Sequence, residues 1–276
     1  MATTVSFAVD SAVGRRTVSL AYERSGTGAP LLLLHGIGHH HQAWGPVLGI
    51  LAAERDVIAV DLPGFGASPG LSGGLSYDVA AVARVLASFC DALGVVRPHV
   101  AGNSLGGLLA LVLGRGRLVR SVTALSPAGF WTGHERRYAF GVLRAMRGAA
   151  LTLPMPLIER LARSAPGRAA LTGTIYTRPG RRSPEAVVAE TVALRGATGF
   201  HQTLTAGRGA AFTDDVPGVP VTIAWGSQDR LLPRRQGLRA GRVIRHARLV
   251  RLPGCGHVPM NDDPAAVARI ILDTSR

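Results

Sequence analysis

The segment Gly102-Asn103-Ser104-Leu105-Gly106 decides how the rest of the chain is interpreted. It matches the pattern G-x-S-x-G, in which a serine lies on a tight, strained turn between a strand and a helix. The glycines two positions before and after the serine let neighbouring backbone approach closely. A serine at the start of a helix also lies where developing negative charge is favoured. The motif therefore predicts that Ser104 is a nucleophile.

The flanking sequence supplies the strand and the helix that this motif requires. Continuous apolar runs at 30–34, 57–60 and 121–125 are typical of strands buried on both faces of a sheet. Apolar residues at helical spacing alternate with these runs, for example over 77–93, where we expect Ser76 to cap the helix. This alternation predicts an α/β fold with a mostly parallel central sheet and helices on both of its faces.

The alternation stops between residues 130 and 218, where helix-like stretches are separated by proline and glycine. Strand and helix alternate again from residue 219 onward. We therefore predict a core domain formed by residues 1–129 and 219–276, and a helical cap inserted at 130–218. Aromatic and apolar residues of the insertion could line a pocket beneath it, although a core role is equally expected for each: Phe130, Trp131, Phe140 and Met146.

A serine hydroxyl is a weak nucleophile and requires a base. Of the nine histidines, His257 is the best candidate, because Gly254-Cys255-Gly256-His257 follows the last predicted strand. The three histidines at 39–41 are contiguous and cannot all face one site, and the others enter or end strands or lie in the insertion or at a helix end.

The base in turn requires a carboxylate that orients it. Asp229 follows the predicted strand at 219–225 and meets this need. Asp61 is a rival, but it lies in a Pro-Gly turn, where a carboxylate usually accepts from backbone amides. Asp262 and Asp263 are too close to His257 in sequence and are interpreted as helix caps.

Acyl transfer also needs donors for an oxyanion. We expect the backbone amides of Leu105 and of Ile37, in His35-Gly36-Ile37-Gly38, to supply them. Removing one such donor typically costs about 3 kcal/mol of transition-state stabilisation.

Composition excludes several other function classes. The net charge is +14, but all 31 basic residues are arginines scattered along the chain, so we predict no nucleic-acid partner. The absence of lysine excludes a P-loop or Schiff-base lysine. The two cysteines, Cys90 and Cys255, fit no zinc pattern and are expected to be free thiols, and we predict no metal and no cofactor.

No apolar run could span a bilayer and the first residues lack a signal-peptide pattern, so we expect a cytoplasmic protein without stable membrane insertion.

The chain resembles the α/β-hydrolase superfamily, in its serine-nucleophile, carboxylesterase-like branch. Five motifs stand in the family order: His35-Gly36-Ile37-Gly38, Asp61-Leu62-Pro63-Gly64-Phe65-Gly66, Gly102 to Gly107, Trp225-Gly226-Ser227-Gln228-Asp229, and Gly254-Cys255-Gly256-His257. The resemblance implies the triad Ser104, Asp229 and His257, in that order along the chain. Haloalkane dehalogenases and epoxide hydrolases use an aspartate nucleophile and do not fit Ser104.

Three functions remain open at this point. The first is hydrolysis of a small-molecule carboxylic ester, lactone or thioester through an acyl-enzyme. The second is hydrolysis of a carbon–carbon bond in ring-cleavage products, whose enzymes carry a similar elbow. Those enzymes typically have Gly-Pro-Gly-Ala in the oxyanion loop and tryptophan after the histidine, whereas this chain has Gly38-His39-His40-His41 and Val258. The third is small-molecule binding without turnover. The sequence indicates no oligomeric state.

Overall fold

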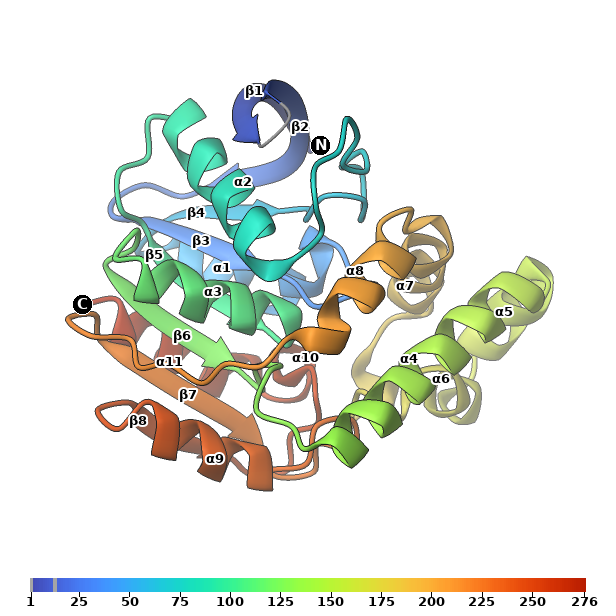
Figure 1. Cartoon of the computed structure of the whole chain (residues 1–276). Coiled ribbons are helices and arrows are strands. Elements are labelled where there is room, and N and C mark those ends of the chain that lie inside the picture. The colour runs from blue at the N-terminus through green and yellow to red at the C-terminus, as the bar shows by residue number, and fades with distance from the viewer. Residues whose placement is uncertain (1, 12–13) are drawn as a thin grey trace.

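A single eight-stranded sheet runs through the molecule (Figure 1). The computed structural model describes residues 2–11 and 14–276 of the 276-residue chain. The strands are Thr3–Ser11 (β1), Gly14–Ser25 (β2), Pro30–Leu34 (β3), Asp56–Val60 (β4), His99–Asn103 (β5), Ser121–Leu125 (β6), Val221–Gly226 (β7) and Arg248–Leu252 (β8). Their order is β1-β2-β4-β3-β5-β6-β7-β8. β3 to β8 are mutually parallel, whereas β2 pairs antiparallel with both β1 and β4.

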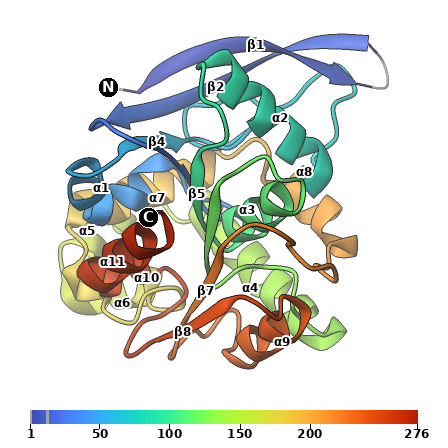
Figure 2. The same cartoon turned by 90° about the vertical axis from the view of Figure 1, so that its left-hand side faces the viewer.

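Helices cover both faces of this sheet (Figure 2). α1 (Gly45–Ala52), α10 (Pro259–Asp262) and α11 (Pro264–Thr274) lie on one face. α2 (Val79–Ala92), α3 (Leu105–Arg115) and α9 (Arg235–Val243) lie on the other. The prediction of an α/β fold with a mostly parallel sheet and helices on both faces is confirmed.

The central strands are buried because their sequences are apolar on both faces. Leu31, Leu32, Leu33 and Leu34 of β3 are at most 1% exposed, and β3 lies between β4 and β5 in the sheet. β8 differs, because it is an edge strand in which Arg248, Leu249 and Arg251 are exposed. Arginine side chains on an edge strand discourage pairing with another molecule.

The structure differs from the sequence-based expectations at several elements. The sequence pattern did not predict strand β1, helix α1 or the two helices of the insertion at Ala165–Thr172 and Phe200–Ala206. The α2 helix begins at Val79, and its cap is Asp78 rather than Ser76. The Asp78 carboxylate accepts from the Ala81 amide at 2.8 Å, while the Ser76 hydroxyl accepts from the Asp78 amide at 3.1 Å. Both residues favour helix starts, so their type alone did not indicate which one caps the helix.

Between β6 and β7 the chain forms helices and no strand. They are α4 (Gly133–Thr152), α5 (Met155–Ala162), α6 (Ala165–Thr172), α7 (Pro184–Gly196), α8 (Phe200–Ala206) and the short 3₁₀ helices η2 (Pro179–Arg181) and η3 (Gly207–Gly209). The start of α4 is fixed by a capping box between Thr132 and Glu135. The buried Glu135 carboxylate also pairs with Arg235 and Arg239 of α9. Burial alone would raise the pKa of Glu135, but these donors hold that pKa below its usual value.

The close packing of α3 on β3 leads to a first prediction. A Cβ placed on Gly106 would lie 2.1 Å from the carbonyl oxygen of Leu34, whereas Gly141 in α4 has open space around it. We expect Gly106→Ala to destabilise the protein strongly, since backbone must move to admit the methyl group. The control, Gly141→Ala, should stabilise it by about 0.5–1 kcal/mol through helix propensity. Urea unfolding of both variants measures the difference, and equal stabilities would contradict this account of the packing.

Candidate active site

Ser104 occupies the junction of β5 and α3 in a strained backbone conformation. Its φ and ψ are 56° and −113°, a region that residues with a side chain rarely adopt. A Cβ on Gly102 would lie 2.1 Å from the Gly106 oxygen, and Gly106 is itself pressed against β3. Both glycines of the motif are therefore required by the space around the turn.

His257 and Asp229 form a buried pair at the carboxyl ends of the strands. His257 Nδ1 lies 2.8 Å from Asp229 Oδ2, and the two side chains are 4% and 0% exposed. The other carboxylate oxygen accepts from the amides of Leu231 at 2.9 Å and Leu232 at 2.8 Å. These two bonds orient the carboxylate, which in turn directs the Nδ1 proton of the imidazole toward Asp229. Nε2 is then left to act as a base.

Ser104 and His257 line the same cavity. In the described part of the chain, Ser104 Oγ has no hydrogen-bond partner, as is common before substrate draws nucleophile and base together. Its main chain is fixed instead: the amide donates to Leu125 O and the carbonyl accepts from the amide of Ala128, both at 3.0 Å. The strained turn is thus tied to the end of β6 and the loop that follows it.

Two further side chains position the loop between β8 and α10, which carries His257 and which we call the histidine loop. The sequence analysis gave these side chains no such role. The Asn103 side-chain amide donates to Leu125 O at 3.1 Å and to His257 O at 2.9 Å, which joins the serine turn to the histidine loop. Asp262 is fully buried, and its carboxylate accepts from the amides of Gly256 at 2.8 Å and Arg178 at 2.8 Å. Asp262 therefore holds the histidine loop against the insertion, while Asp263 caps α11 as expected.

Ile37 and Leu105, whose amides we expect to donate to an oxyanion, both lie beside Ser104. Both residues line a cavity together with Ser104, and among the described residues neither amide has a backbone acceptor. The loop passes close to the serine, since a Cβ on Gly36 would lie 3.3 Å from Ser104 Cβ. Gly38, at φ 79°, packs against Leu194 of α7, so a helix of the insertion contacts this loop directly.

The Asp61 carboxylate supports the end of the loop between β3 and η1 (His41–Trp44), which carries Ile37 and which we call the oxyanion loop. Asp61 itself lies outside the Ser104 cavity. It accepts from the amides of His41 at 2.6 Å and Ala67 at 2.9 Å, and it contacts His41 Nδ1 at 3.0 Å. The hydrogen bond to Asp61 raises the pKa of His41. Burial alone would raise the pKa of Asp61, but the His41 bond and the backbone donors hold that pKa below its usual value. Asp61 thus accepts from backbone amides as expected, with His41 as an additional partner.

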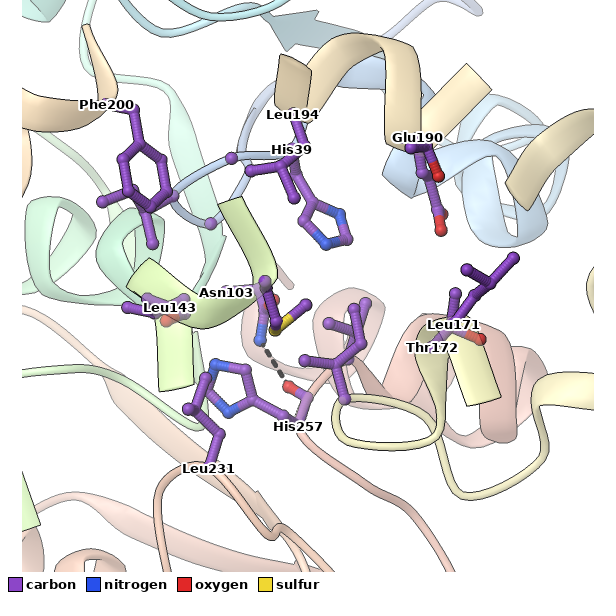
Figure 3. Close-up of a pocket in the computed structure, with 18 residues that line it drawn as sticks. His39, Asn103, Leu143, Leu171, Thr172, Glu190, Leu194, Phe200, Leu231 and His257 are labelled. Carbon is purple, nitrogen blue, oxygen red and sulfur yellow. Dashed lines mark hydrogen bonds between the residues drawn. The ribbon is translucent and has the colours of Figure 1, made fainter. Parts of the chain in front are cut away.

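Two cavities meet at Ser104. The first, which we call the polar pocket, has a volume of about 70 Å³ and includes His39, Glu190 and His257 in its wall (Figure 3). The second, which we call the apolar pocket, has a volume of about 50 Å³ and includes Leu105. The residues shared by both cavities are Ile37, Ser104, Leu143 and Leu231.

Of the four residues expected to line a substrate site, three line one of the two pockets and the fourth lies in the core. Met146 lines the polar pocket, and Trp131 and Phe140 line the apolar pocket. Phe130 lines neither pocket and packs against the ring of Phe212 in the core. The sequence analysis missed four lining residues of inserted helices, because helical spacing does not tell which face of such a helix meets the pocket: Leu143, Glu190, Leu194 and Phe200. It also missed His39 and Leu231, which lie in loops.

Other features of composition can also be located. Cys90 and Cys255 are free and buried, and burial raises the pKa of each thiol to about 12. Over residues 2–11 and 14–276, the structure contains no group of three or more His, Cys, Asp or Glu side chains suited to a metal ion. In the same residues, no helix is both long enough and apolar enough to span a bilayer.

Comparisons with known proteins agree with this architecture. Human monoacylglycerol lipase is 25% identical over 269 residues, which cover 91% of this chain and 76% of that protein. A thermophilic esterase from Thermogutta terrifontis superposes with a TM-score of 0.76 at 23% identity, covering 98% of this chain and 97% of the other. A meta-cleavage product hydrolase from Pseudomonas fluorescens IP01 gives 0.75 at 21% identity, covering 98% and 96%.

At these identities the two structures show the common fold alone, and they include two different chemistries. The model of the alpha/beta hydrolase family matches residues 31–270. The chain therefore belongs to the alpha/beta hydrolase family.

Proposed function

We propose that the protein is a serine hydrolase that cleaves a carboxylic ester, lactone or thioester of a small to medium apolar substrate. The observation that carries this proposal is the 2.8 Å contact between His257 Nδ1 and Asp229 Oδ2 beside a cavity that Ser104 also lines. A base oriented by a carboxylate next to a serine on a strained turn is the arrangement that acyl transfer needs.

The reaction proceeds in two halves. His257 Nε2 takes the proton of Ser104 as Oγ attacks the carbonyl carbon, and Asp229 stabilises the imidazolium. The amides of Ile37 and Leu105 donate to the oxyanion of the tetrahedral intermediate. The carbon–oxygen bond to the alcohol breaks as His257 returns the proton to the leaving oxygen. Water, deprotonated by His257, then attacks the acyl-enzyme and releases the acid and free Ser104.

The insertion at residues 130–218 acts as a cap over this site. Its residues Trp131 and Phe140 supply apolar surface to one pocket and Met146 to the other. We assign these three side chains to substrate binding and Phe130 to the core. Because Gly38 packs on Leu194, movement of α7 is coupled to the loop that carries the oxyanion donor Ile37.

Ester cleavage is favoured over the two alternatives by the residues around the site. His39 and Val258 occupy the loops where carbon–carbon bond hydrolases typically carry other residues, and both line the polar pocket. The Asp229–His257 pair beside the Ser104 cavity favours turnover over ligand binding alone, because acyl transfer requires an oriented base.

The nucleophile can be tested by covalent labelling. We expect the native protein to react with a fluorophosphonate probe and to hydrolyse short-chain p-nitrophenyl esters over many turnovers. Ser104→Ala should abolish labelling and lower kcat by several orders of magnitude. Ser126→Ala is a matched control, because Ser126 is a buried serine at the end of the next strand, and it should keep both. Full activity of Ser104→Ala would disprove the serine mechanism, and a single slow acylation would favour the receptor.

The acid of the triad can be separated from its rival by two asparagine substitutions. Asp229→Asn should leave the fold intact but misorient His257, lowering kcat by about 10⁴-fold. Asp61→Asn should act mainly on stability, because Asp61 accepts from His41 and Ala67 away from the Ser104 cavity. Kinetics and thermal unfolding of both variants decide the matter. A well-folded, inactive Asp61→Asn with an active Asp229→Asn would reverse the assignment.

A further inference from the structure

The end of the polar pocket away from the triad holds a buried ion pair that the proposed chemistry does not use. Glu190 of α7 is 8% exposed, and its Oε1 accepts from the Tyr176 hydroxyl at 2.7 Å and from Arg182. The Arg182 guanidinium also lies over the Tyr176 ring, 5.4 Å from its centre. Two residues of the insertion, Tyr176 and Arg182, thus fix one oxygen of this carboxylate in place.

The second carboxylate oxygen has no such support. Among the described residues, Glu190 Oε2 has no hydrogen-bond partner although it is buried. Leaving a buried acceptor without a donor is costly, more so when the group is charged. Glu190 lines the polar pocket, and Figure 3 shows its side chain extending from α7 into the space between His39 and Leu171. A ligand in this pocket can therefore supply the missing donor.

His39 faces the same space from the oxyanion loop (Figure 3). Burial lowers the pKa of His39 well below its usual value, with smaller contributions from nearby His35, His40 and Arg182. The imidazole is therefore neutral near pH 7 and offers one N–H donor and one acceptor nitrogen. Neither ring nitrogen bonds to a described residue, so both are available to a ligand.

The charges at this end of the pocket select the kind of group that can bind. Arg182 pairs with Glu190, and burial raises the pKa of Glu190 while it lowers that of His39, so burial disfavours net charge at this end of the pocket. An ammonium group would meet the Arg182 guanidinium, and a carboxylate would meet Glu190. A hydroxyl group can donate to Glu190 Oε2 and accept from the His39 N–H without either repulsion.

The positions of the two pockets tell which part of the substrate carries this hydroxyl. His257, which protonates the leaving oxygen, lines the polar pocket but not the apolar one. Leu105, one of the two proposed oxyanion donors, lines only the apolar pocket, and Ile37, the other, lines both. We propose that the apolar pocket binds the acyl chain and that Glu190 and His39 bind a free hydroxyl of the leaving alcohol, so that the preferred substrates are monoesters of diols or polyols. This inference rests on the proposed ester hydrolysis.

Two esters that differ only in that hydroxyl test the inference: propyl butanoate and 3-hydroxypropyl butanoate. The native protein should show the higher kcat/KM for the hydroxypropyl ester. Glu190→Gln places an amide N–H₂ donor where the acceptor was, and the ratio of the two kcat/KM values should fall roughly tenfold, as expected for loss of one hydrogen bond to a charged group. Glu185→Gln, an exposed change on the same helix, should keep the native ratio.

Because Glu190→Gln leaves Arg182 buried without its partner, a second variant removes the whole cluster. Tyr176→Phe, Arg182→Met and Glu190→Met together leave no orphaned charge, a replacement that is often neutral for stability. This variant should show the same fall in the ratio, with thermal unfolding as the check on folding. An unchanged ratio in the folded variants, or equal kcat/KM values for both esters with the native protein, overturns the hydroxyl site alone. No turnover of either ester by the native protein overturns the proposed function together with this site.

Discussion

The close approach of three backbone segments around Ser104 is the constraint on which the site depends. Gly102, Gly106 and Leu34 leave no room for a methyl group between them, so the chain must turn sharply from β5 into α3. The serine at that turn is forced to a φ of 56°. Such strain persists only where the surrounding structure over-determines it, and here buried strands on both sides do so. Packing thereby places a hydroxyl and the first amides of a helix at one point.

The other groups are brought to this point by hydrogen bonds between loops. Asn103 bonds the backbone of His257, and Asp229 is oriented by two amides of its own loop. Asp262 ties the histidine loop to the insertion through the amide of Arg178. The insertion is therefore hydrogen-bonded to the loop that carries His257, and its Leu194 packs against Gly38 in the loop that carries Ile37. Residues 130–218 thus contact both of the loops that meet at Ser104.

Much of this could be predicted from the sequence because its signals are local. The buried strands at Pro30–Leu34 and Ser121–Leu125 have the bounds expected from their apolar runs. The pairing of Asp229 with His257 could be predicted because each residue follows a strand closely in the sequence. The roles of Asn103 and Asp262 depend on contacts between segments far apart in sequence, which no spacing reveals. Glu190 was missed for the same reason, since its partners Tyr176 and Arg182 meet it only in the folded insertion.

The account rests on a covalent acyl group carried by Ser104. Mass spectrometry of the native protein, quenched in acid within milliseconds of mixing with a butanoate ester, tests this directly. A gain of one butanoyl group, located by peptide mapping on Ser104 and lost once the ester is exhausted, is the predicted result. Steady turnover with no acylated protein under conditions where deacylation is slow, or with the acyl group on another residue such as Cys255, would contradict the central claim.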